Sequence, residues 1–142
     1  MSVMLSFGLA LGSLSYKQQV LASSAIASQY AFYAADAALE CALYADQQQN
    51  LFAYEAYDGS AKSMVCDGNA FSVAQISSPS QVVSTTRVPL DAGKHCADIS
   101  VYKPPVGGGT TYLFSQGYDV SCGTVASPGG ARFVARGLNA RY

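Results

Sequence analysis

Residues 17–49 read KQQVLASSAIASQYAFYAADAALECALYADQQQ, a stretch that contains neither glycine nor proline. Ten of the 24 residues from Ala22 to Ala45 are alanine, which has the highest helix propensity of the amino acids. The residues before Lys17 include no charged side chain, and most of them are apolar. We therefore predict one long helix that runs from near the N-terminus to about Tyr54.

The apolar residues of this helix predict two contact faces. One stripe, interrupted by Asp36, has apolar side chains at spacings of seven and four residues: Phe32, Leu39 and Leu43. A second line has a tyrosine at every fourteenth position: Tyr16, Tyr30 and Tyr44. Two faces on one helix indicate two partners, one of which is the rest of its own domain and the other something outside it.

The composition changes after Ser60. Glycine, proline, serine and threonine become frequent, and apolar residues alternate with polar ones, as in short antiparallel strands. We predict five strands: Asn69–Ser77, Gln81–Val88, Cys96–Lys103, Tyr112–Cys122 and Ala131–Tyr142. The fourth has Tyr112, Phe114, Tyr118, Val120 and Cys122 on one parity, which predicts that this face is buried. The order predicts an α+β fold in which a long N-terminal helix packs on a C-terminal antiparallel β-sheet.

The chain has four cysteines, Cys41, Cys66, Cys96 and Cys122, and an even number in a short chain is typical of an oxidising compartment. The two cysteines nearest in sequence, Cys41 and Cys66, are 25 residues apart, so the chain has no CxxC pair of the kind found in zinc sites. Of three possible pairings we favour Cys41–Cys66 and Cys96–Cys122. A chain reversal near Gly109 would bring Cys96 and Cys122 to nearly opposite positions. Each bridge would close a loop of about 26 residues and stabilise the fold by roughly 3 kcal/mol in the chain-entropy model.

The N-terminal apolar run is short for a membrane span. A bilayer-spanning helix needs about 20 apolar residues, more than the run before Lys17 supplies. The run also lacks the basic start of a secretory signal. We expect either an apolar environment other than a bilayer, or a sequence that begins inside a longer apolar segment. Gly8 and Gly12 have the small-residue spacing that lets helices approach closely.

The composition excludes several classes of function. Only 12% of the residues are charged, against about 25% in a typical soluble domain, and this composition excludes intrinsic disorder. A net charge of −1 makes nucleic acid an unlikely main partner. His95 and Cys96 are neighbours that would point to opposite faces of a strand, so they would not form a nucleophile–base pair. Asp36 and Glu40 are four residues apart on the helix and could form a carboxylate pair, but no third catalytic group is near them in the sequence. We expect no catalytic, metal or cofactor site.

The charges are divided between the helix and the C-terminal strand. Five acids and no base lie in residues 36–58, the second half of the helix and its exit: Asp36, Glu40, Asp46, Glu55 and Asp58. Three bases and no acid lie near the C-terminus: Arg132, Arg136 and Arg141. Complementary charges favour a specific register of contact. We predict that Asp36 and Glu40 pair with these arginines, either within the subunit or between copies.

Residues 28–44, SQYAFYAADAALECALY, resemble the helix that follows the membrane segment in bacterial type IV pilin-like proteins of the PilX class. The resemblance lies in a YAAD-x-x-(L/I)-E core, followed here by Cys41. Residues 136–142, RGLNARY, are similar to the closing strand of these proteins. Pilins begin with a leader, a cleavage site and a glutamate near the mature start, whereas Leu5 would stand at that glutamate if Met1 were the start. Either the sequence begins inside the mature apolar segment, or the subunit lacks the glutamate, as some minor pilins do.

The resemblance implies a structural subunit of an extracellular filament, a type IV pilus on the cell surface. Its helix would sit in the inner membrane, and the pilus assembly machinery would then pack it against further copies of the chain. Residues 1–27 would form the membrane and filament-core half of the helix, and residues 28–142 the globular head. The predicted core residues are Met4, Leu5, Phe7, Leu9, Leu11, Leu14, Tyr16, Val20 and Leu21. The alternatives are a minor pilin or pseudopilin that initiates or caps a filament, and a membrane-tethered adhesive or binding module.

Overall fold

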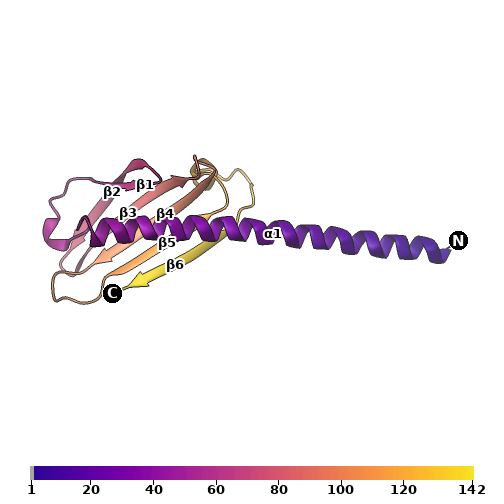
Figure 1. Ribbon diagram of the computed structural model, residues 1–142, viewed down its shortest axis with the longest axis horizontal. Helices are drawn as coiled ribbons and strands as arrows, with labels where there is room; N and C mark the ends of the chain where they lie inside the picture. Colours follow the sequence, from indigo (N-terminus) through magenta and orange to yellow (C-terminus); the bar gives the residue numbers. More distant parts are fainter. Residues whose placement is uncertain (1) are drawn as a thin grey trace.

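The computed structural model describes the backbone of residues 2–142 and the side chains of residues 12–142. One long helix packs across one face of a six-stranded antiparallel sheet, and this confirms the predicted α+β fold (Figure 1). The elements in chain order are α1 (Ser2–Gln47), the 3-10 helix η1 (Tyr54–Ala56), β1 (Lys62–Cys66), β2 (Asn69–Ser78), β3 (Gln81–Leu90), β4 (His95–Lys103), β5 (Tyr112–Tyr118), α2 (Cys122–Ala126) and β6 (Ala135–Arg141).

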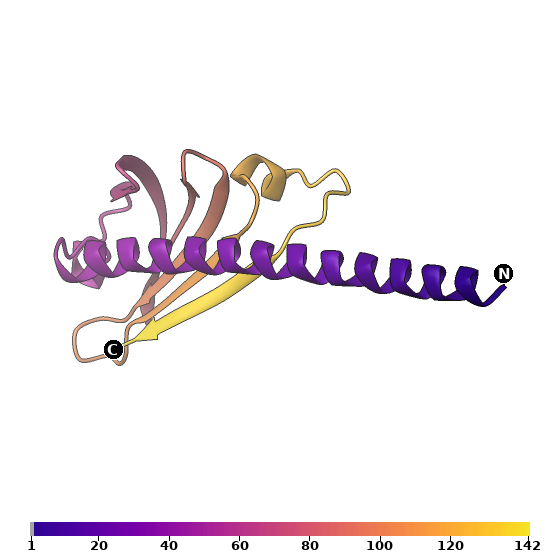
Figure 2. The ribbon, with the colours of Figure 1, turned by 45° about the vertical axis from the view of Figure 1, so that its right-hand side comes forward.

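Each strand of the sheet pairs with its neighbour in sequence, in the order β1-β2-β3-β4-β5-β6. The C-terminal half of α1 crosses the sheet, whereas the N-terminal half projects beyond it. Both views of the ribbon show this arrangement (Figure 1, Figure 2). The 46 residues of α1 correspond to a rod about 69 Å long at 1.5 Å per residue. The head therefore covers only part of the helix.

The predicted helix end at Tyr54 is wrong, because α1 ends at Gln47. Asn50 has a positive φ of 51°, which asparagine tolerates better than most residues and which cannot continue a right-handed helix. The amide of Leu51 then donates to the carbonyl oxygen of Ala45 at 3.0 Å, so that one of the last carbonyls of the helix is satisfied. This reversal places Phe52, which is only 1% exposed, in the core.

Alanines form the face of α1 that meets the sheet, at helical spacing: Ala31, Ala34, Ala35, Ala38, Ala42 and Ala45. Of the predicted stripe, Leu39 is buried and Leu43 is half-buried, but Phe32 is 44% exposed. The stripe was therefore only partly correct. Small side chains let the helix backbone approach the sheet, and the larger apolar residues border this contact rather than fill it.

The closest approach lies at Gly117 of β5. A Cβ atom there would stand 2.1 Å from the carbonyl oxygen of Ala31 and 2.3 Å from the amide nitrogen of Ala35. The β5 face turned to the helix carries Leu113, Ser115 and Gly117, and the aromatic residues of the opposite parity are not on it. The prediction that the face with Tyr112 and Phe114 packs in the core is therefore wrong, because close helix packing selects the parity with the small side chains.

Several strand boundaries differ from the predictions. β1 was not predicted, because its five residues alternate too briefly to stand out. The fourth predicted strand is too long: β5 stops at Tyr118, and Cys122 begins α2. The last predicted strand starts too early, since β6 begins at Ala135. The second and third predicted strands agree with β3 and β4 to within two residues, and the first matches β2 to one residue.

Candidate interaction surfaces

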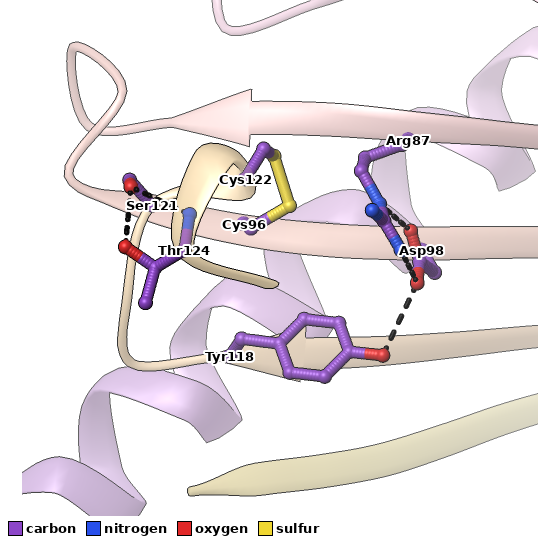
Figure 3. Close-up of a disulfide and its surroundings, with 7 residues drawn as sticks. All are labelled: Arg87, Cys96, Asp98, Tyr118, Ser121, Cys122 and Thr124. Carbon is purple, nitrogen blue, oxygen red and sulfur yellow. Dashed lines mark hydrogen bonds and ion pairs between the residues drawn. A yellow bond between two sulfur atoms is a disulfide. The ribbon is translucent and has the colours of Figure 1, made fainter. Parts of the chain in front are cut away.

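Both predicted disulfides are present, Cys41–Cys66 and Cys96–Cys122. The first ties α1 to β1, the strand at one edge of the sheet. The second does not join two strands, as the predicted hairpin required, because the residue that pairs with Cys96 is Tyr118. Cys122 instead reaches Cys96 from the short helix α2, which Ser121 caps by accepting a hydrogen bond from the Thr124 amide (Figure 3).

The projecting half of α1 leaves several large apolar side chains uncovered. Every residue from Gly12 to Ile26 is exposed, and burial begins at Ala31. The large apolar side chains of this half have the following exposed fractions: Leu14 55%, Tyr16 69%, Val20 48%, Leu21 70% and Ile26 52%. The predicted filament-core residues Met4, Leu5, Phe7, Leu9 and Leu11 lie outside the described side chains.

The tyrosine line is also exposed, at 69% for Tyr16, 49% for Tyr30 and 59% for Tyr44. The sheet therefore does not contact this line as a core face. Tyr16 and Tyr44 lie on surface of α1 that the sheet leaves open, whereas Tyr30 also contacts His95 of β4.

The predicted charge pairs do not form within the subunit. Asp36 and Glu40 are exposed, and among the described residues neither makes an ion pair with an arginine. Arg136 instead donates from Nε to the Ser28 hydroxyl at 2.7 Å, which links β6 to α1. The guanidinium of Arg141 lies 5.5 Å from the centroid of the Tyr112 ring. Arg132 is exposed in the loop before β6.

A buried polar cluster joins the end of α1 to the sheet, and sequence reasoning missed it. Asp46 is 3% exposed, and its Oδ2 accepts from Lys103 Nζ at 2.6 Å and from the hydroxyl of Tyr142. Burial, then the neighbouring Asp46 carboxylate, raise the pKa of the Tyr142 hydroxyl well above its usual range. The only sequence signal was an acid on the otherwise apolar and alanine-rich face of the helix.

A second network lies on the sheet face away from α1. Arg87 donates from Nε and Nη2 to the two carboxylate oxygens of Asp98, at 2.6 and 2.8 Å, and Tyr118 donates to Oδ2 at 3.1 Å (Figure 3). The hydrogen bond to Asp98 raises the pKa of the Arg87 guanidinium, and burial raises that of Tyr118. The cross-strand register places Arg87 opposite Asp98, so this network stabilises the pairing of β3 with β4.

A groove lies between α1 and the β1–β2 and β3–β4 turns, at one end of the strands. No sequence signal pointed to it. Its volume is about 420 Å³, and its lining includes Tyr30, Tyr33 and Leu90. The Tyr30 ring stacks on the imidazole of His95, with centroids 4.9 Å apart. Asp67 and Asp91, in the β1–β2 and β3–β4 turns, complete its lining. We call this the tyrosine–aspartate groove.

In the structure His95 and Cys96 do not form a nucleophile–base pair. Cys96 is a disulfide partner, and His95 contacts Tyr30, Asp91 and the Asp119 carbonyl instead. Within the described residues, no three His, Cys, Asp or Glu side chains gather in a way that could hold a metal ion. A search of the described helices for a stretch long and apolar enough to cross a membrane finds none.

The fold and these surfaces define a long-helix, antiparallel-sheet α+β protein that is compatible with a pilin-like fold. Comparison with protein families, with curated proteins and with solved structures finds no match to this chain.

Proposed function

We propose that this chain is a structural subunit of an extracellular type IV pilus-like filament of the PilX class. In this proposal the projecting half of α1 is held in the inner membrane first. The pilus assembly machinery then packs it against the same segment of other copies. The observation that carries the proposal is the uninterrupted exposure of the helix from Gly12 to Ile26, with large apolar side chains around its surface.

The physical argument rests on the water contact of these side chains. Burial of apolar surface is favourable by about 25 cal/mol per Å², and several large apolar side chains exposed on one segment are typical of an interaction site. A single copy cannot cover these side chains, because the head reaches only as far as Ala31 and its neighbours. Identical rods that pack along their length can bury them on every copy and produce an open helical assembly.

The remaining features support a structural role. The Cys41–Cys66 disulfide and the Asp46–Lys103 ion pair fasten the sheet to the C-terminal half of α1, and the Cys96–Cys122 disulfide ties α2 to β4. Such a head keeps its shape while the other half of the helix exchanges one apolar environment for another. The family resemblance of residues 28–44 and 136–142 leads to the same proposal from the sequence.

The test compares two substitutions of equally exposed apolar residues in the full chain. Leu21→Glu changes a side chain 70% exposed on the projecting helix, and Ile76→Glu changes one 73% exposed on β2. After removal of detergent, we expect the unchanged chain and the Ile76→Glu variant to sediment as filaments and Leu21→Glu to stay in the supernatant. Equal sedimentation of the two variants, or a monomeric unchanged chain, would count against the proposal.

A further inference from the structure

The tyrosine–aspartate groove and Arg141 lie at opposite ends of the head. The groove is formed by the β1–β2 and β3–β4 turns and by α1 near Tyr30. Arg141 lies at the end of β6, beside Tyr142, which contacts Asp46 in the last turn of α1. Asp46 follows Tyr30 by 16 residues on α1, which corresponds to a separation of roughly 24 Å along the helix axis. Figure 1 shows the C-terminus at the end of the head away from the projecting helix.

The groove has the chemistry that recognises an arginine side chain. A guanidinium stacks on aromatic rings and binds carboxylates through paired hydrogen bonds. Tyr30 and Tyr33 supply exposed rings on one wall, at 49% and 63% exposure. Asp67 and Asp91 supply carboxylates on the other. Leu90, which is only 6% exposed, adds an apolar residue to the lining, against which the arginine stem can pack.

The carboxylates of the groove are held in place but are not neutralised. Asp67 Oδ2 accepts a hydrogen bond from the Asp91 amide at 3.1 Å, which links the two turns. In the described part of the chain Asp67 makes no ion pair. Asp91 lies 3.6 Å from Lys94 Nζ and 3.7 Å from His95 Nε2. The pair with Lys94 has side chains 59% and 71% exposed, and such exposed pairs are weak. The groove therefore retains negative charge for a partner.

Arg141 carries the complementary charge. Arg141 is exposed and lies on β6, which is an edge strand of the sheet. Its guanidinium rests near the Tyr112 ring, at 5.5 Å from the centroid, and among the described residues it makes no ion pair with a carboxylate. Arg136, by contrast, is engaged with Ser28.

We propose that the tyrosine–aspartate groove binds Arg141 of a second copy of this chain, so that the heads contact one another end to end. Arg141 and the groove are different surfaces at opposite ends of the head, so a copy that uses both binds one neighbour at each end and extends the assembly. This inference rests on the proposed filament function and adds the contact that sets one head against the next. It assigns Asp67 and Asp91, rather than Asp36 and Glu40, as the partners of the C-terminal charge.

The test is a zero-length cross-link between a carboxylate and an amine in the assembled full chain. Arg141→Lys keeps the positive charge and supplies an amine that a carbodiimide can join to an aspartate. Assemblies of equal parts of ¹⁵N-labelled and unlabelled chains distinguish links between copies from links within one. Arg132→Lys and Arg136→Lys are the matched controls, because each places the same amine elsewhere in the C-terminal segment.

We expect a mixed-isotope peptide that joins position 141 to Asp67 or Asp91 in Arg141→Lys, and its loss when Asp67→Asn and Asp91→Asn are added. Asn keeps the size of both side chains and tolerates their positive φ of 48° and 50°. The corresponding change Asp36→Asn with Glu40→Gln should leave the cross-link in place. Filaments without this link, or with links to the groove from position 132 or 136, would overturn the inference. A chain that forms no filament at all would instead overturn the proposed function.

Discussion

The hydroxyl of Tyr142, beyond the end of β6, donates a hydrogen bond to the carboxylate of Asp46 in the last turn of α1. Lys103, in the last position of β4, donates to the same oxygen at 2.6 Å. The other oxygen, Oδ1, is buried and has no hydrogen-bond partner in the described part of the chain. The carboxylate thus depends on two side chains from the sheet, and it anchors the end of the helix to them.

Lys103→Met should destabilise the head by about 3 kcal/mol, because it leaves the buried Asp46 charge without its cation. Lys94→Met is the matched control and should change the free energy of unfolding by no more than about 0.5 kcal/mol, since its pair with Asp91 is exposed. Urea unfolding of the two variants measures both values. Equal effects would show that the Asp46–Lys103 pair does not anchor the helix.

The stability of the head should fall in alkaline solution, partly through Tyr142. The pKa of this hydroxyl is raised in the folded state from an ordinary value of 10.0, so the unfolded chain loses the proton first. The stabilisation is therefore complete below about pH 10 and is lost as the pH rises towards the folded-state pKa. Tyr142→Phe should flatten this decline, as measured by urea unfolding at a series of pH values. An unchanged slope would contradict the assignment.

Gly117→Ala tests the contact between α1 and β5. The new Cβ would overlap the backbone of Ala31 and Ala35, so the helix must move away, at a cost of about 3 kcal/mol. Gly123→Ala in α2, where the nearest atom is 3.9 Å away, is the control and should cost little. Thermal unfolding compares them. A fully stable Gly117→Ala variant would mean that the helix does not pack this closely on the strand.

The sequence predicted the long helix and the antiparallel sheet because both depend on local patterns. The alanine-rich stretch contains no residue that breaks a helix, and the alternation of β3 and β4 has the period of a strand. It did not predict which face each element buries. Phe32 is exposed and Gly117 is buried because a close helix–sheet contact favours small side chains, which a hydrophobicity pattern does not register.

The candidate surfaces show the same division. The exposed apolar helix could be recognised from the uncharged run before Lys17. The cysteine pairing was predicted correctly, but the hairpin from which Cys96–Cys122 was inferred does not extend to Cys122. The tyrosine–aspartate groove could not be recognised, because Tyr30, Asp67 and Asp91 come from three separate segments and meet only in the fold. Asp46 was counted as one acid of a charged patch, although the fold turns it inward to Lys103.

The central claim is that the projecting half of α1 becomes the core of an assembly of many copies. Hydroxyl-radical footprinting of the full chain measures this directly, before and after removal of detergent allows it to assemble. Leu14 and Val65 are each 55% exposed in the single subunit, and Leu21 and Ile76 are 70% and 73% exposed, which makes two matched pairs. The account predicts that oxidation of Leu14 and Leu21 stays low in the assembled material while Val65 and Ile76 remain reactive. Equal oxidation within both pairs would contradict it.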